Sequence, residues 1–140
     1  MAISVIDAPV SSAVDSATNA FSEATDISTK IDVSEAYLLI ELAFTRNEIG
    51  GGLMADTDKP EHGFYIVDEV TTFPGADGSV NYFAVNAWTG DVWSVWFCPQ
   101  KHRKNPALKV KQAEIRRRFS PAELKSYREL SRIRPGCMFP

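Results

Sequence analysis

Residues 80–98 read VNYFAVNAWTGDVWSVWFC, and this stretch decides the fold. Its two halves, 80–87 and 91–98, are rich in the β-branched and aromatic residues that favour strands. A Thr-Gly pair separates the halves, and Gly90 suits the positive φ of a tight turn. The stretch therefore predicts a β-hairpin. Apolar side chains occur at odd and at even positions, so we expect both faces of the sheet to be covered.

A further strand is predicted upstream of the hairpin. The run FYIVDEVTTF (64–73) has strand composition, and the turn sequence PGADGS (74–79) joins it to the hairpin. Short connections between consecutive strands imply an antiparallel meander of three strands. The polar residues 52–63 before it predict a loop.

Helix signals flank the predicted sheet. Asp32 and Glu35 have the spacing of a capping box, and residues 50–52 are all glycine, which predicts a helix over 33–48. Two Pro residues, each preceded by a good N-cap residue, predict C-terminal helices over 106–118 and 121–132.

The stretch KHRKNPALKVKQAEIRRRF (101–119) contains eight of the fifteen Lys and Arg residues and a single acid. Leu108, Ile115 and Phe119 fall on one side of the helix predicted there. We therefore expect this stretch to dock as a folded helix and to cover the second face of the sheet. A disordered basic arm would not need an apolar stripe.

These signals predict an α+β fold in which an N-terminal helix packs on a three-stranded antiparallel meander, followed by two short C-terminal helices. We expect residues 1–31 to be flexible or weakly helical and residues 32–140 to form one domain. No run approaches the roughly 18 apolar residues of a membrane span, so no membrane role is expected. The sequence leaves the location open: periplasmic if a signal peptide was removed, and otherwise cytoplasmic.

Charge is divided between two blocks. Residues 1–100 carry three Lys or Arg and fifteen Asp or Glu, a formal charge of −12, whereas residues 101–140 carry twelve and three, a charge of +9. Such asymmetry is typical of a surface for nucleic acid or an acidic partner. The alternative is that the basic block folds across the acidic body and the two charges largely cancel.

No catalytic constellation, metal-ligand spacing or phosphate-binding loop is evident, so we expect no enzyme activity, metal or cofactor. One alternative is a thiol enzyme centred on Cys98, with His102 in reach as a base. Cys98 and Cys137 could instead form a disulfide, or remain one packed thiol and one tail thiol. Sequence alone does not decide the pairing.

The hairpin also carries a family resemblance. In YFAVNAWTGDVWSV, the residues Val85, Asn86, Thr89, Gly90 and Val92 match a V-(D/N)-x-x-T-G-x-V pattern, and the run resembles the closing hairpin of PepSY-like domains. The resemblance covers about a quarter of the chain. It implies a non-catalytic binding or inhibitory module of the bacterial cell envelope, although the two basic helices depart from that family.

The sequence therefore predicts a protein-binding module, and specifically an inhibitor or immunity-type protein that occludes a partner such as a bacterial toxin or hydrolase. Nucleic-acid binding by the basic helices is the alternative. The oligomeric state is left open. The predicted partner-binding residues are one exposed aromatic anchor and the cations of the basic block: Trp88, Lys101, Arg103, Lys104, Lys111, Arg116, Arg117 and Arg118.

Overall fold

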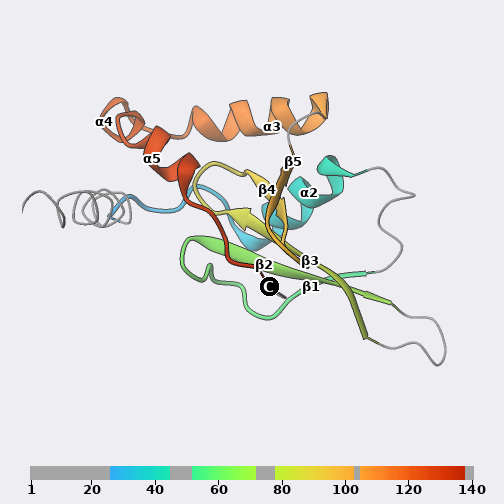
Figure 1. Cartoon of the computed structure of the whole chain (residues 1–140). Coiled ribbons are helices and arrows are strands. Elements are labelled where there is room, and N and C mark those ends of the chain that lie inside the picture. Colours follow the sequence, from blue (N-terminus) through green and yellow to red (C-terminus); the bar gives the residue numbers. More distant parts are fainter. Residues whose placement is uncertain (1–25, 45–51, 72–77, 103–104, 138–140) are drawn as a thin grey trace, which may run out of the picture.

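The computed structural model describes residues 26–44, 52–71, 78–102 and 105–137 (Figure 1). Five strands form one antiparallel sheet whose spatial order follows the chain. They are β1 (Gly52–Ala55), β2 (Phe64–Thr71), β3 (Gly78–Asn86), β4 (Val92–Ser94) and β5 (Gln100–His102). The α+β class is therefore confirmed, but the meander has five strands in place of the predicted three.

The two extra strands are short and lie at the edges of the sheet. β1 occupies part of the predicted loop 52–63, and its Leu53 and Ala55 pack against the main core. β5 lies inside the basic stretch and pairs with β4. Strands of three or four residues carry too little alternation to be recognised from a polar sequence. β4 itself ends at Ser94, well before the predicted end at residue 98.

Helix α2 (Val33–Ala43) packs across the sheet, as predicted. Asp32 caps it, because the Asp32 carboxylate accepts a hydrogen bond of 2.9 Å from the Glu35 backbone amide. Its buried residues Ala36, Leu39 and Ile40 form the main core with the inward residues of β2, β3 and β4. The predicted end at residue 48 is too late, because α2 ends at Ala43 and Phe44 has extended backbone angles (φ −125°, ψ 155°). Residues 45–48 lie outside the described residues.

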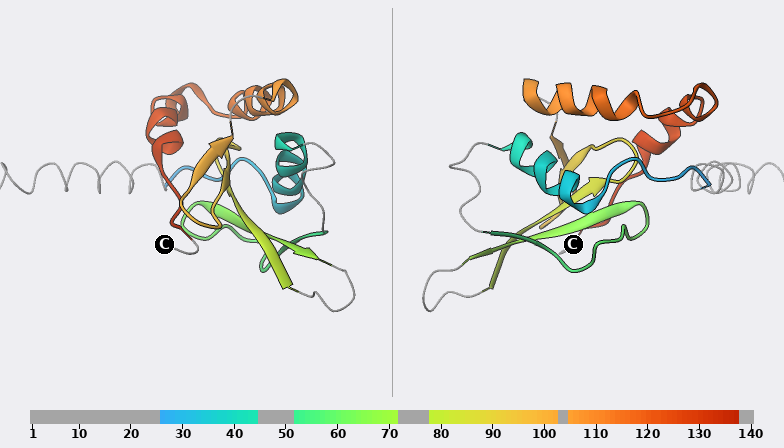
Figure 2. Two further views of the ribbon diagram at one scale, coloured as in Figure 1. Left: turned by 45° about the vertical axis from the view of Figure 1, so that its right-hand side comes forward. Right: turned by 180° about the vertical axis from the view of Figure 1, so that it is seen from behind.

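Helix α3 (Pro106–Arg116) lies on the same side of the sheet as α2, as both views of Figure 2 show. Leu108 and Ile115 are fully buried in the core that α2 covers, which confirms the apolar stripe. The expectation that α3 covers the second face is wrong. Gly90 explains the close packing: a Cβ there would stand 2.8 Å from Ile115 Cδ1, so only glycine lets the helix approach this turn.

The last predicted helix is divided in two. α4 (Pro121–Leu124) begins at a capping box formed by Ser120 and Glu123, and α5 (Tyr127–Arg132) follows after a break. The break allows Tyr127 and Leu130 to pack in a second apolar cluster with Trp88 and Phe119. A straight helix over 121–132 was therefore an incorrect prediction.

The second face of the sheet is covered by the C-terminal tail, residues 133–137. Phe64, Ala84, Trp93 and Val95 form a small cluster on this face, and Ile133 packs against it. Figure 2 shows the tail running along the side of the sheet opposite α2. A short extended segment thus covers the face on which we expected a helix.

A buried hydrogen-bond network fixes the hairpin turn. The Asn86 side-chain oxygen accepts from the backbone amides of Trp88 (2.9 Å) and Thr89 (3.0 Å), and its amide nitrogen donates to the Leu130 carbonyl at 2.9 Å. The Thr89 hydroxyl donates to Asp91 at 2.8 Å, and Gly90 has a φ of +77°. The hairpin motif therefore has a structural role, and it ties the turn to α5.

The domain begins before the predicted boundary at residue 32. Ile31 is buried in the main core, and the Lys30 backbone amide donates to the Ala87 carbonyl at 2.9 Å. The Trp88 indole Nε1 donates to the Ile27 carbonyl at 2.8 Å. Residues 26–31 thus belong to the folded domain, and residues 1–25 lie outside the described residues.

Candidate partner-binding surface

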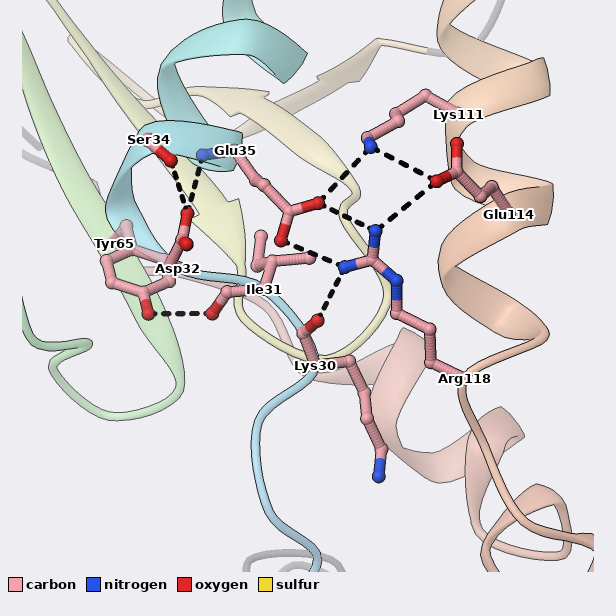
Figure 3. Close-up of polar contacts among 9 residues, drawn as sticks. All are labelled: Lys30, Ile31, Asp32, Ser34, Glu35, Tyr65, Lys111, Glu114 and Arg118. Atoms are coloured by element: carbon pink, nitrogen blue, oxygen red, sulfur yellow. Dashed lines mark hydrogen bonds and ion pairs between the residues drawn. The ribbon is translucent and has the colours of Figure 1, made fainter.

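The basic block is held by an acid of the N-terminal half. Figure 3 shows the Glu35 carboxylate, in the first turn of α2, facing Arg118 and Lys111. Arg118 binds it with two nitrogens, Nη1 to Oε1 at 2.9 Å and Nη2 to Oε2 at 2.8 Å, and Lys111 Nζ lies 3.2 Å from Oε2. Glu114 contacts both cations, at 3.4 and 3.5 Å. We call these four residues the Glu35 cluster.

The Glu35 cluster joins the start of α2 to α3, and the residues next to it contact β2. Arg118 Nη1 also donates to the Lys30 carbonyl at 2.8 Å, next to Ile31, whose carbonyl accepts from the Tyr65 hydroxyl at 2.8 Å (Figure 3). Hydrogen bonding by Arg118 lowers the pKa of Glu35, against an opposing effect of burial, and the same bond raises the pKa of Arg118. Both groups therefore stay charged at neutral pH.

Two further pairs connect the acidic and basic blocks. Lys30 Nζ lies 2.9 Å from Glu123, and it also lies 5.2 Å from the centre of the Phe119 ring. Lys101 Nζ lies 3.2 Å from Asp91 across the β4–β5 hairpin. At these residues and in the Glu35 cluster, charges of the acidic block and the basic block therefore pair with each other within the molecule.

These contacts change the status of the predicted partner-binding residues. Lys111 and Arg118 are engaged within the molecule, so they are not free to meet a partner. Arg116 is exposed and stacks over the Tyr127 ring at 4.7 Å, and Arg117 is exposed at the end of α3. Trp88 is only 4% exposed and is a core residue, which corrects its prediction as a surface anchor. Of the other three predicted cations, Lys101 is paired with Asp91, and Arg103 and Lys104 lie outside the described residues.

The predicted partner-binding residues do not include an aromatic row that lies beside the loop between β4 and β5. Tyr82 and Trp96 stack with ring centres 5.4 Å apart, and the Trp96 and Phe97 rings meet edge-on at 6.5 Å. Phe97 is 67% exposed. Trp96 and Phe97 line a groove of about 650 Å³ beside the loop that joins β4 to β5. The aromatic row thus runs from the half-buried Tyr82 and Trp96 to the exposed Phe97.

A second groove, of about 690 Å³, lies on the other side of Pro99 and Gln100. Trp93 lines it, and the Trp93 ring lies between two cations, Lys101 at 5.6 Å and Arg134 at 5.7 Å. Arg132 also lines this groove. We use the name aromatic–basic rim for the aromatic row and the cations of the second groove together, namely Tyr82, Trp96, Phe97, Lys101, Arg132 and Arg134.

The two cysteines meet at the edge of the aromatic–basic rim. Cys98 is exposed, Cys137 is half-buried, and both are free thiols. The influence of Cys98, together with burial, raises the pKa of the Cys137 thiol. The structure thus brings the two residues together, but as thiols and not as a disulfide.

His102 contacts a serine in the structure. The Ser94 hydroxyl and His102 Nε2 lie 2.7 Å apart, and the Phe44 ring meets the imidazole edge-on at 4.4 Å. This contact joins β4 to β5. The sequence suggested His102 as a base for Cys98. The structure instead places Cys98 with Cys137, and His102 with Ser94.

Among the described residues, no group of three or more His, Cys, Asp or Glu side chains could hold a metal ion. In the same part of the chain, no helix has the length and apolar character that crossing a bilayer requires.

Comparisons with known proteins find a similar fold in one solved structure. No model of a known protein family matches the chain, and no curated protein matches it, so the resemblance to PepSY-like domains stays a prediction. One solved structure, a type VI secretion system effector–immunity complex from Pseudomonas protegens, contains a similar chain. The TM-score is 0.52 and the identity 22%, over 70% of this chain and 87% of that chain. At this identity the likeness concerns the fold alone.

Proposed function

We propose that this protein is a non-catalytic binding module that inhibits a partner protein by covering its active site, as an immunity-type protein does. The observation that carries the proposal is the aromatic–basic rim, where the exposed Phe97 adjoins a groove bordered by cations. Aromatic residues and Arg are the residue types that contribute most to binding in protein interfaces. The proposed partner surface is therefore apolar at its centre and acidic beside it.

The charge distribution supports this placement over the basic helix. Cations of the Glu35 cluster already have carboxylate partners, and breaking those pairs would cost free energy on binding. Arg132 and Arg134 are exposed at the rim and are placed to attract an acidic partner. Steering by such groups mainly raises the association rate.

The fold likeness is a second support. The similar chain belongs to an effector–immunity complex. We choose the immunity side because the sequence predicts no catalytic constellation. The resemblance to PepSY-like domains also implies an inhibitory role, and the proposal includes that role.

A pull-down with matched variants tests the proposal. Tagged wild-type chain, Phe97→Ala and Val110→Ala would be used as baits, with and without nuclease. Val110 is the control, because it is 71% exposed but lies on α3. We expect one protein to be retained stoichiometrically by wild type and by Val110→Ala and to be recovered in clearly lower yield with Phe97→Ala. The activity of the purified partner should then fall to zero when one equivalent of this protein is added.

The opposite outcomes are also informative. Equal retention by all three baits would contradict the rim as the binding surface. Recovery of many nucleic-acid-binding proteins that nuclease abolishes would favour the nucleic-acid alternative, whose affinity should fall steeply with salt.

A further inference from the structure

The second groove, which lies between β5 and the end of α5, contains more positive charge than the chain itself neutralises. Lys101, Arg132 and Arg134 all line it. Among the described residues, Lys101 pairs with Asp91 at 3.2 Å, whereas neither arginine forms an ion pair. Both arginines are exposed. Two cations that line the groove are thus available to an anion.

The same groove has a buried donor without a hydrogen-bond partner. Trp93, which lines it, is only 6% exposed, and its indole Nε1 has no partner within the part of the chain that the structure describes. The indole of Trp88, in contrast, donates to the Ile27 carbonyl at 2.8 Å. Buried donors are nearly always paired, because an unpaired one has lost its bond to water. The donor and the two arginines therefore favour the same class of ligand, one with negatively charged oxygen atoms.

The surroundings of the groove favour a short acidic peptide segment as that ligand. Residues 1–100 carry three basic and fifteen acidic residues, a formal charge of −12, so a long polyanion such as nucleic acid would be repelled. Carboxylates match the fork of an arginine guanidinium with two parallel hydrogen bonds. Pro99 and Gln100 line both grooves, and Phe97 lines the first one. A segment whose apolar side chain contacts Phe97 therefore places its neighbouring residues at the second groove.

We propose that the second groove is a carboxylate-binding site, and that its ligand is an acidic segment of the partner protein next to an apolar residue. Arg132 and Arg134 each bind a carboxylate of that segment, whereas Lys101 keeps its pair with Asp91. The Arg134 guanidinium lies 5.7 Å from the centre of the Trp93 ring, and this contact holds it in place and lowers the ordering cost of binding. The inference rests on the proposed function and adds to it the chemistry of the partner's segment.

Peptide titration tests the site without the partner. The nitrogen-15-labelled full chain would be titrated with a blocked peptide of one Phe and three Glu, and with a control peptide in which Gln replaces each Glu. The indole N–H signals are the readout, assigned with Trp93→Phe and Trp88→Phe. We expect the Trp93 signal to shift saturably with the Glu peptide alone, because bound carboxylates change the field at its unpaired N–H. The Trp88 signal should stay in place and is the internal control.

Three variants locate the binding groups. Arg134→Gln and Arg132→Gln should each weaken binding of the Glu peptide by about 10-fold, because each loses a charge-assisted pair. Arg128→Gln is the matched control, since Arg128 is exposed on α5 and does not line the groove, and its affinity should equal that of wild type.

Absence of a saturable shift at Trp93, an equal response to both peptides, or equal affinities of Arg134→Gln and Arg128→Gln would each overturn the inference. So would inorganic phosphate or a short single-stranded oligonucleotide that binds as tightly as the Glu peptide. The proposed function is measured separately, in the pull-down. A partner that is retained less by Phe97→Ala would support it even if the groove binds no acidic peptide, and a groove that binds the peptide would stand even if no partner is recovered.

Discussion

Replacing Glu35 by Gln tests whether the basic block is held internally. The substitution removes the charge that faces Arg118 and Lys111 and keeps one oxygen acceptor. The side chains of Glu35 and Arg118 are 22% and 32% exposed, so the pair is intermediate between a buried and a surface ion pair. Surface pairs contribute about 0–1 kcal/mol, and hydrogen bonds to charged groups contribute about 1.5–3 kcal/mol. We expect a loss of about 1–2 kcal/mol in the free energy of unfolding at pH 7.

The loss should depend on pH with a definite sign. Arg118 lowers the pKa of Glu35 in the folded state from its ordinary value of 4.5. A carboxyl group with a lowered folded pKa stabilises the protein above its unfolded pKa. That contribution disappears as the pH falls through the folded pKa. The stability difference between wild type and Glu35→Gln should therefore be full at pH 7 and shrink below pH 4.5.

Urea unfolding followed by tryptophan fluorescence measures this difference, because Trp88 and Trp93 are both buried. Glu41→Gln is the matched control, since Glu41 lies on the same helix and is exposed. Unfolding curves would be compared at pH 7 and at pH 3.5, both at low salt. A loss equal to that of the control, or one of the same size at both pH values, would refute the reasoning.

Three further changes test other parts of the structure. Phe97→Ala should change the free energy of unfolding by less than about 0.5 kcal/mol. It should weaken partner binding, measured by calorimetry, by about 5- to 30-fold, because about 1–2 kcal/mol of apolar burial is lost. Unchanged affinity would exclude the ring as an anchor. Gly90→Ala should cost about 2–4 kcal/mol in urea unfolding, since its φ is +77° and its Cβ would crowd Ile115. Ile115→Val, which removes that Cδ1, should recover about 1 kcal/mol of the cost in the double variant, and strict additivity would count against the contact. Arg118→Glu should lower the unfolding midpoint clearly more than Arg117→Glu, because Arg117 is exposed and outside the Glu35 cluster; equal shifts would mean that the cluster contributes little.

The central hairpin could be predicted because its signals are local. The Thr-Gly pair and the strand composition of residues 80–98 are read within a few residues, and the structure confirms β3, the turn at Gly90 and β4. The capped start of α2 and the stripe of Leu108 and Ile115 are local in the same sense. Elements whose determinants lie close together in the sequence are the ones that sequence reasoning recovered.

The candidate site was mostly not predicted, because it depends on contacts between distant segments. Arg118 and Glu35 are 83 residues apart, and nothing local indicates that α3 would lie beside α2. Trp88 was expected on the surface, but Gly63 and Ile27 lie against its indole from elsewhere in the chain. Phe97 was placed within a strand, whereas β4 ends at Ser94 and leaves the following aromatic rings in an exposed loop.

The packing of the sheet explains why an aromatic row reaches solvent. α2 and α3 cover the same face, so the other face depends on the short tail, which covers Trp93 and Val95. Within the described residues, that cover leaves Phe97 67% exposed. Burying this ring would stabilise a complex by about 1–2 kcal/mol. Either a partner or a second copy of the chain could bury it. Light scattering across concentration separates the two: a dimer that Phe97→Ala dissociates would make the rim a self-interface and would require the proposed inhibitor to use another surface.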